Sequence, residues 1–380
     1  MVASPAGRAG ALGRHGTQSM THKLSLIGVC KEYGEVVALK PTSLDVDAGE
    51  FLTLLGPSGS GKTTLLQLVA GLLAPTAGEI FLDGKPTSRA PPHKRDIGLV
   101  FQNYALFPHL TAAENIAFPL RMRRVDSATV AKRVGAMLDL VQLPQVADRF
   151  PAEMSGGQQQ RIALARAAVY EPSVILMDEP LGALDKALRE DMQAEIKRIH
   201  RELGATILYV THDQEEAMAM SDRICLMRDG SIEQIGTPGD LYFAPRSVFA
   251  ATFLGHSNIL AGTLTGRGGD RATVKLAFGP EIAVRDPVGT QAIGSEVRIL
   301  VRPESVVSDG GAGAAVALDA RLEHSVIVGS LCRRHWRLPD GTAIAEASLT
   351  APRHGSDRAG DAGRIGWLVD SAILLERGEA

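Results

Sequence analysis

A glycine-rich run near the start of the chain carries the residues best suited to binding phosphate. Residues 56–64, Gly-Pro-Ser-Gly-Ser-Gly-Lys-Thr-Thr, fit the pattern G-x-x-x-x-G-K-[ST]. The run lies between the apolar segment Phe51–Leu55 and the apolar-periodic segment Leu65–Leu73, so the predicted order is strand, glycine loop, helix. Glycines let backbone N–H groups turn toward one point, and phosphate then lies at a helix N-terminus. The sequence therefore predicts a site for the phosphates of a nucleoside triphosphate.

The end of this loop carries the side chains expected to do chemistry. Lys62 is predicted to reach the β- and γ-phosphates, and Thr63 to place its hydroxyl on Mg²⁺. The alternative, a Gly/Ser surface loop, does not call for Lys-Thr at its end. The residues predicted to contact the nucleotide here are Gly56, Pro57, Ser58, Gly59, Ser60, Gly61, Lys62, Thr63 and Thr64.

Two adjacent carboxylates follow a buried-strand pattern. The apolar run Val174–Met177 ends in Asp178 and Glu179. At the carboxyl end of a strand, Asp178 is predicted to hold Mg²⁺ and Glu179 to polarise an attacking water. Such a pattern alone more often marks a solvated strand end, but the glycine loop upstream favours the catalytic interpretation.

A second candidate anion site precedes the predicted helix Gln159–Val169. Ser155 can cap this helix, and Gly156 and Gly157 expose backbone N–H groups at its start, before Gln158. The alternative is an ordinary Gly-Gly helix start.

The elements that must position these residues alternate between strands and helices from residue 22 to about 235. The short apolar runs Ile97–Phe101, Val174–Met177 and Thr206–Val210 suit strands of a mainly parallel sheet buried on both faces. Residues 103–157 carry helical periodicity without a strand, which predicts a helical subdomain. Farther on, Asp185 is the predicted cap of a helix with one apolar stripe.

The residue pattern changes at about His256. From there, short β-rich runs alternate with turns, which predicts a small all-β barrel. The predicted fold is an α/β P-loop NTPase domain followed by a small all-β barrel domain. The predicted divisions are a disordered tail at 1–21, a nucleotide-binding domain at 22–255 and an all-β domain at 256–380.

Composition excludes several classes of function. A chain of 380 residues is too long for one core, and its net charge of −3 provides no overall attraction to nucleic acid or anionic lipid. No run of about 18 apolar residues occurs, so no membrane span is expected. The three cysteines are widely spaced, form no metal-ligand pattern and are expected to be small buried residues in a reducing cytoplasm.

Together these motifs resemble, in order, those of the nucleotide-binding subunit of ATP-binding cassette (ABC) transporters. The resemblance covers residues 22–240 and departs at Met154, where the family usually has Leu, an apolar exchange of little expected effect. The matching residues are Tyr33 (aromatic stacker), Gly56–Thr63 (Walker A), Gln102 (glutamine loop), Ser155–Gln158 (signature), Asp178 with Glu179 (Walker B), Asp185 (D-loop) and His212 (switch histidine).

The resemblance implies an ATPase that uses ATP and Mg²⁺. It implies that Tyr33 stacks on adenine, that Gln102 coordinates Mg²⁺ and senses the γ-phosphate, and that Glu179 is the general base. Lys62 and His212 would contact the γ-phosphate in the transition state. Judged alone, Tyr33 and His212 would more often be structural residues.

The resemblance also implies partners. The signature closes over ATP held by a second chain, which implies a homodimer. An integral membrane permease would dock on a surface that includes Tyr104, Leu106 and Phe107, which are expected to be exposed; the alternative is a loop folded onto the subdomain's own core.

Finer matches are similar to the spermidine/putrescine-type importer ATPases. They lie at Ala105–Asn115, Glu153–Arg161 and Val301–Glu304. The β-domain resembles the TOBE-like domain of that group, which implies an OB-like barrel. They imply a peripheral subunit on the cytoplasmic face of the inner membrane that drives uptake of a small solute, a polyamine, delivered by a periplasmic solute-binding protein. Alternatives are importers of ferric iron, 2-aminoethylphosphonate, sulfate or sugar, and a non-transport ABC ATPase. No nucleic-acid partner is expected, because the β-domain lacks a stripe of basic and aromatic residues.

Overall fold

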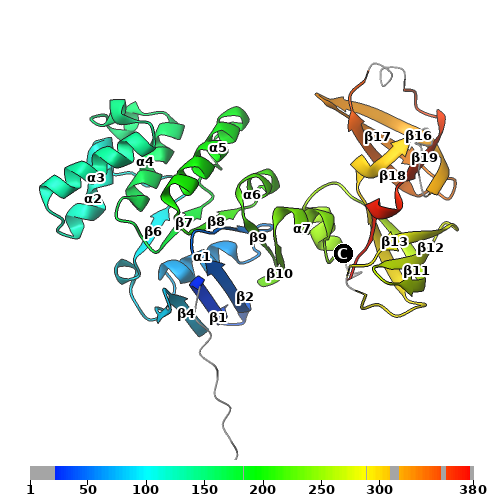
Figure 1. Ribbon diagram of the computed structural model, residues 1–380, viewed down its shortest axis with the longest axis horizontal. Coiled ribbons are helices and arrows are strands. Elements are labelled where there is room, and N and C mark those ends of the chain that lie inside the picture. The colour runs from blue at the N-terminus through cyan, green and yellow to red at the C-terminus, as the bar shows by residue number, and fades with distance from the viewer. Residues whose placement is uncertain (1–21, 183, 288, 309–315, 352–356, 377–380) are drawn as a thin grey trace, which may run out of the picture.

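The computed structural model describes residues 22–376 apart from 183, 288, 309–315 and 352–356 (Figure 1). The predicted disordered tail, residues 1–21, lies outside the described residues. None of the described helices combines the length and the hydropathy that a membrane-spanning segment requires.

A six-stranded sheet with the order β10-β9-β3-β8-β7-β6 forms the centre of the N-terminal part. Its strands are β3 (Phe51–Leu55), β6 (Ile97–Val100), β7 (Val174–Asp178), β8 (Ile207–Thr211), β9 (Arg223–Arg228) and β10 (Ser231–Gly236). Every neighbouring pair is parallel except β9 with β10. All residues of β3 and β8 are buried, as expected for inner strands of a sheet covered on both faces. The predicted mainly parallel sheet is confirmed.

A four-stranded antiparallel sheet, in the order β2-β1-β4-β5, lies against the first sheet. Its strands are β1 (His22–Tyr33), β2 (Val36–Asp47), β4 (Ala77–Leu82) and β5 (Lys85–Pro86). The helix α1 (Lys62–Ala70) packs between the two sheets, and Leu65 and Leu68 share one apolar core with Leu24 of β1 and Leu54 of β3. This packing holds the N-terminus of α1 beside the end of β3.

The helical subdomain gathers at one end of the molecule (Figure 1). It contains α2 (Ala112–Met122), α3 (Ser127–Leu140) and α4 (Gly156–Ala168). Thr111 and Glu114 form a capping box at α2, as their spacing predicts. The helix α4 starts three residues before the predicted Gln159, because the Ser155 side chain caps it by accepting the N–H of Gln158.

The remaining helices connect the sheet to the C-terminal strands. They are α5 (Lys186–Leu203), α6 (Gln214–Met220), α7 (Pro238–Phe243) and α8 (Val248–Phe253), and the short 3-10 turns are η1 (Pro92–Lys94), η2 (Pro144–Val146), η3 (Pro151–Glu153), η4 (Pro303–Ser305) and η6 (Val369–Ser371). On the sheet face opposite α1, Met192, Ile196 and Ile199 of α5 pack in a core with Ile207 and Tyr209 of β8.

The predicted all-β C-terminal part with a small barrel is confirmed, and the structure adds a second sheet that shares one apolar core with the barrel. A closed barrel contains β11 (Asn258–Gly268), β12 (Arg271–Leu276), β13 (Glu281–Arg285), β14 (Glu296–Val301) and β20 (Ala372–Leu374). A five-stranded sheet contains β15 (Val306–Ser308), β16 (Val316–Val328), β17 (Leu331–Arg337), β18 (Ala343–Leu349) and β19 (Ala362–Trp367). Because β20 pairs with both β14 and β13, it closes the barrel, and the strands between β14 and β20 form a separate sheet.

One buried arginine attaches the barrel to the helices before it. Arg302, just after β14, donates from Nη1 to the carbonyl of Ala251 (2.8 Å) and the hydroxyl of Ser257 (2.7 Å). Its Nη2 donates to the carbonyl of Tyr242 (3.0 Å), and the Tyr242 hydroxyl donates to Glu304 (2.7 Å). These bonds cross the stretch between α8 and β11 in which the predicted domain boundary, 255/256, falls.

Arg302→Ala is expected to lower the free energy of unfolding by about 3 kcal/mol, because it leaves buried carbonyl groups without donors. Chemical denaturation measures this loss, and limited proteolysis should show faster cleavage between α8 and β11. Arg285→Ala, on an exposed position of β13, serves as the control. Equal stability of the two variants would show that Arg302 does not hold the barrel in place.

Candidate functional site

The glycine loop is pressed between two neighbouring backbones. A Cβ at Gly56 would lie 2.3 Å from the carbonyl oxygen of Met227, and one at Gly61 would lie 3.0 Å from that of Ala38. Both glycines have positive φ angles, 156° and 97°, which larger residues rarely adopt. The loop therefore needs glycine at these positions for conformation and for space, and its backbone is held in the shape that precedes α1.

Lys62 is buried inside this loop. Its ammonium donates to the carbonyls of Gly56 (2.8 Å) and Pro57 (2.9 Å). Burial lowers the pKa of Lys62, and the carboxylates of Glu179 and Asp178 act in the opposite direction. A positive charge therefore lies close to both predicted catalytic carboxylates.

The end of β7 concentrates negative charge. Burial, and then the neighbouring charge of Glu179, raise the pKa of Asp178, whereas Lys62 lowers it. Glu179 has a φ of 44°, in the left-handed region that costs a non-glycine residue conformational energy. Its N–H donates to the carbonyl of Val210 on β8 (3.0 Å), so the turn is tied to the next strand.

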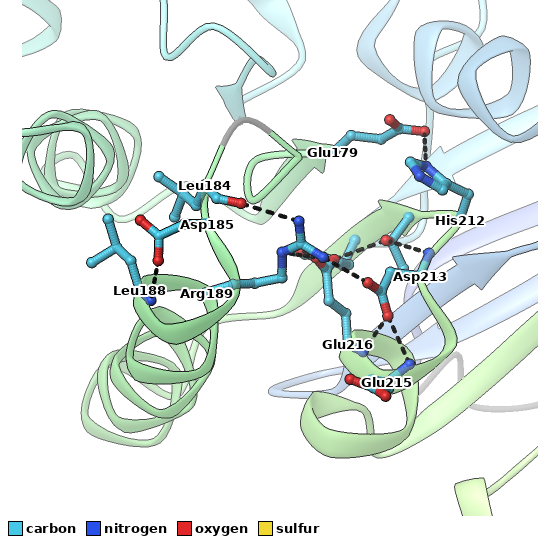
Figure 2. Close-up of polar contacts among 11 residues, drawn as sticks. Glu179, Leu184, Asp185, Leu188, Arg189, His212, Asp213, Glu215 and Glu216 are labelled. Carbon is cyan, nitrogen blue, oxygen red and sulfur yellow. Dashed lines mark hydrogen bonds and ion pairs between the residues drawn. The ribbon is translucent and has the colours of Figure 1, made fainter. Parts of the chain in front are cut away.

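His212 completes this group from the end of β8. Its Nδ1 lies 3.1 Å from Oε1 of Glu179 (Figure 2). Because β3, β8 and β7 are parallel neighbours, their carboxyl ends meet at one edge of the sheet. The structure thus brings together Lys62, Asp178, Glu179 and His212, which lie up to 150 residues apart in the sequence.

The residues predicted to hold Mg²⁺ fit that ion chemically. Thr63 is exposed in the first turn of α1, and the amide nitrogen of Gln102 would lie 3.5 Å from a Cβ on Gly182, in the turn after Glu179. With Asp178 they offer hydroxyl, amide and carboxylate oxygens, the donors that Mg²⁺ prefers. The described residues contain no group of three or more His, Cys, Asp or Glu able to hold a metal by themselves. The set suits an ion that is bound mainly by phosphate and water.

Tyr33 lies at the end of β1, in the hairpin whose second strand contains Ala38. Half of its surface is exposed, and Nζ of Lys31 lies 4.9 Å from its ring centre. Since the backbone of Ala38 borders Gly61, this hairpin adjoins the glycine loop, and the Tyr33 ring is accessible for stacking.

Ser155–Gln158 lies apart from the glycine loop. Ser155 and Gln158 hydrogen-bond each other in a capping box, and no hydrogen bond or ion pair among the described residues joins them to the loop. A Cβ on Gly156 would instead lie 3.4 Å from Leu184. Asp185 caps α5 by accepting the N–H of Leu188 (3.0 Å; Figure 2). The two predicted anion sites of one chain are therefore separate.

The expected exposure of the segment after Gln102 is wrong for Tyr104, which is buried. Arg166 of α4 donates to the carbonyls of Tyr104 (2.9 Å) and Ala105 (2.7 Å), which holds the loop against the subdomain. Leu106 and Phe107 are partly buried, and the Phe107 ring packs 4.5 Å from that of Phe118. This segment therefore follows the alternative interpretation, in which the loop packs onto the core of the helical subdomain.

Three polar residues near His212 were missed in the sequence. Arg189 donates to Asp213 (2.9 Å), and Nε of Arg189 lies 3.8 Å from Glu216 (Figure 2). The sequence Asp213-Gln-Glu-Glu indicates a helix cap at Asp213. The contact between Arg189 and Asp213 could not be predicted, because these residues lie 24 positions apart and no short pattern links them.

Comparisons with known sequences agree with these motifs. Residues 39–182 match the family described as ABC transporter. Spermidine/putrescine import ATP-binding protein PotA of Frankia alni is 44% identical, over 93% of this chain and 79% of that protein. The protein of the same name from Rubrobacter xylanophilus is 43% identical, over 92% of this chain and 93% of that protein. The similarity thus extends beyond the α/β part into the C-terminal strands.

Solved structures resemble the N-terminal part. A dimeric ATP-binding cassette in a post-hydrolysis state, bound to ADP and Pi, is 36% identical with a TM-score of 0.50, and covers 57% of this chain and 98% of its own. A part of an ABC transporter complex from Clostridium perfringens is 29% identical with a TM-score of 0.55, and covers 62% of this chain and 93% of its own.

Asp178→Asn is expected to stabilise the nucleotide-free protein. Folding raises the pKa of this carboxyl, so the folded state favours its protonated form. The stability that the proton contributes is fully present below the ordinary pKa of 3.8 and is lost as the pH rises through the pKa of the folded state, where the carboxyl ionises. The neutral variant should therefore unfold about 2 °C above wild type at about pH 8, with the difference vanishing at about pH 3.

Thermal unfolding at several pH values measures this effect, with the exposed Asp139→Asn as control. A lower melting temperature for Asp178→Asn at neutral pH would mean that attraction to Lys62 outweighs burial and repulsion.

Proposed function

The chain belongs to the ABC transporter family, as the ATP-hydrolysing subunit of an importer, and we propose that the solute it helps to import is a polyamine such as spermidine or putrescine. The observation that carries this proposal is identity of 43–44% to two spermidine/putrescine import proteins over more than nine-tenths of the chain. Similarity of that extent includes the C-terminal strands as well as the ATPase motifs, and so supports a shared transport system.

The glycine loop is the proposed binding site for the triphosphate of ATP. Backbone N–H groups of residues 56–64 and the N-terminus of α1 favour an anion. Lys62 would exchange its bonds with the Gly56 and Pro57 carbonyls for the β- and γ-phosphates. The adenine would stack on the exposed ring of Tyr33.

Hydrolysis proceeds by attack of water on the γ-phosphorus, with cleavage of its bond to ADP. Glu179 is proposed to accept the proton of this water, and the Glu179–His212 contact orients both side chains toward the transferred group. Thr63, Gln102 and Asp178 would hold Mg²⁺, which when bound neutralises charge on the phosphates. Lys62 and His212 stabilise the transition-state charge.

A homodimer would complete each ATP site. Ser155 and Gln158 hydrogen-bond each other, and among the residues that the structure describes no polar contact joins them to the glycine loop; we propose that this turn instead meets the ATP of a second copy. Ser155 is exposed before α4, and the backbone N–H groups at the start of this helix suit a phosphate group. The similar cassette bound to ADP and Pi is itself dimeric, which supports this arrangement.

The remaining partners follow from an importer subunit. Integral permease subunits would form the pore, with this chain on the cytoplasmic face of the inner membrane and a periplasmic protein delivering the solute. Leu106 and Phe107, partly exposed beside α2, are the proposed contact for the permease. The β11–β20 region is proposed to be regulatory.

Glu179→Gln tests the assignment of the base. The variant should bind ATP as wild type does, but its kcat should fall by about 10²- to 10⁴-fold because no group accepts the proton of the water. With ATP and Mg²⁺ it should accumulate as a dimer, measured by light scattering after size-exclusion chromatography. Glu296→Gln, on an exposed position of β14, is the control and should hydrolyse normally. Wild-type turnover in Glu179→Gln would exclude this residue as the base.

Transport identifies the solute. Cells that lack this chain should lose uptake of radiolabelled spermidine and putrescine, and the wild-type gene, but not Glu179→Gln, should restore it. Unchanged polyamine uptake together with loss of sulfate, sugar or iron uptake would contradict the proposed solute.

A further inference from the structure

One arginine connects the turn after Glu179 to the loop that carries His212. Arg189 lies in the first turns of α5, and 29% of its side chain is exposed. Its Nη1 donates to Oδ2 of Asp213 (2.9 Å), and its Nη2 donates to the carbonyl of Leu184 (3.1 Å; Figure 2). The planar guanidinium therefore spans two segments whose ends carry predicted catalytic residues.

Asp213 transmits this contact to the backbone beside His212. Its Oδ1 caps α6 by accepting the N–H groups of Glu215 (2.8 Å) and Glu216 (3.2 Å). Its own N–H donates to the hydroxyl of Thr211 (3.0 Å). One carboxylate oxygen thus holds α6 and the other holds Arg189, so a shift of Arg189 moves the residue adjacent to His212.

A buried carboxylate lies behind Asp213. The side chain of Glu216 is 3% exposed and accepts hydrogen bonds from the hydroxyls of Tyr209 and Thr211, each at 2.8 Å. Burial raises the pKa of Glu216, the hydrogen bonds from Tyr209 and Thr211 lower it, and the charges of Asp213 and Arg189 act in opposite directions, Asp213 raising it and Arg189 lowering it. Removal of Arg189 takes away the cation that faces both Asp213 and Glu216. Repulsion between these two carboxylates would then displace the loop that carries His212.

The other side of Arg189 leads to the signature turn. Leu184, whose carbonyl Arg189 holds, lies beside Gly156, and a Cβ on Gly157 would lie 3.4 Å from both Leu188 and Met192 of α5. The start of α5 therefore packs against the N-terminus of α4 through apolar side chains and contacts the His212 loop through Arg189. These two surfaces serve different ATP molecules in the proposed dimer.

We propose that Arg189 is a positioning residue that couples the two ATP sites of the dimer. Closure of the Ser155 turn over the ATP of the second copy displaces Leu184 and α5, and Arg189 passes this movement to Asp213 and so to His212 in the same chain. This inference rests on the proposed function, since it requires that Ser155 and His212 act on different nucleotides.

The substitution Arg189→Met keeps an aliphatic side chain of similar length and removes the guanidinium group that binds Asp213 and Leu184. We expect kcat to fall about 10- to 100-fold, because a displaced His212 no longer meets the transferred group. ATP affinity should stay within about twofold, since Arg189 does not line the glycine loop, and the Hill coefficient for ATP should fall toward about 1. Arg189→Lys should recover part of kcat, because the charge beside Asp213 remains, but not the cooperativity.

Arg198→Met is the matched control, because Arg198 lies on the same helix and forms its ion pairs with Glu195 and Glu202. Wild-type kcat and Hill coefficient in folded Arg189→Met would overturn the proposal, as would equal losses in Arg198→Met. If Arg189→Met does not fold, Asp213→Asn, which keeps the cap but loses the charge, should reproduce the loss of cooperativity, and normal cooperativity there would overturn the proposal. Glu179→Gln tests the ATPase site independently, so failure of the coupling is distinguishable from failure of the proposed function.

Discussion

Parallel pairing of β3, β8 and β7 is the constraint on which the site depends. Asp178 pairs with Val210, and Leu55 pairs with Thr211, so these three strands end at one edge of the sheet. The glycine loop, the two carboxylates and His212 each follow one of these ends. One continuous stretch of chain could not bring the glycine loop, the two carboxylates and His212 together, because they extend from the ends of three different strands.

Convergence of these groups opposes folding. Asp178 and Glu179 lie next to each other beside a buried Lys62, and Glu179 adopts a left-handed backbone conformation. Burial of like charges and backbone strain both destabilise the folded chain, and they are common where a site is prepared for a charged ligand. The apolar cores on both faces of the sheet provide the stability that offsets them.

The helix α5 joins parts of the chain that would otherwise be independent. Its apolar side chains pack on the sheet and on the start of α4, and its first turns contact the loop after β8. The C-terminal β-units attach farther away, through Arg302 to the helices α7 and α8. The helix α5 therefore contacts both the turn at the start of α4 and the loop that carries His212, whereas the β-units attach through separate contacts.

Local interactions explain what could be predicted from the sequence. The capping box of Thr111 and Glu114 and the cap at Asp185 each depend on neighbours within a few residues. The glycine loop and Asp178-Glu179 were likewise readable, because their chemistry is carried by adjacent residues.

Only the tertiary structure decided the features that depend on distant partners. Tyr104 is buried in the apolar core that α2 and α4 share, and Arg166, 62 residues away, holds its carbonyl. The barrel closes through β20 at the end of the described chain, and Arg189 meets Asp213 across 24 residues. Such contacts arise from packing of whole elements, and packing follows from the summed burial of many side chains rather than from any short pattern of residues.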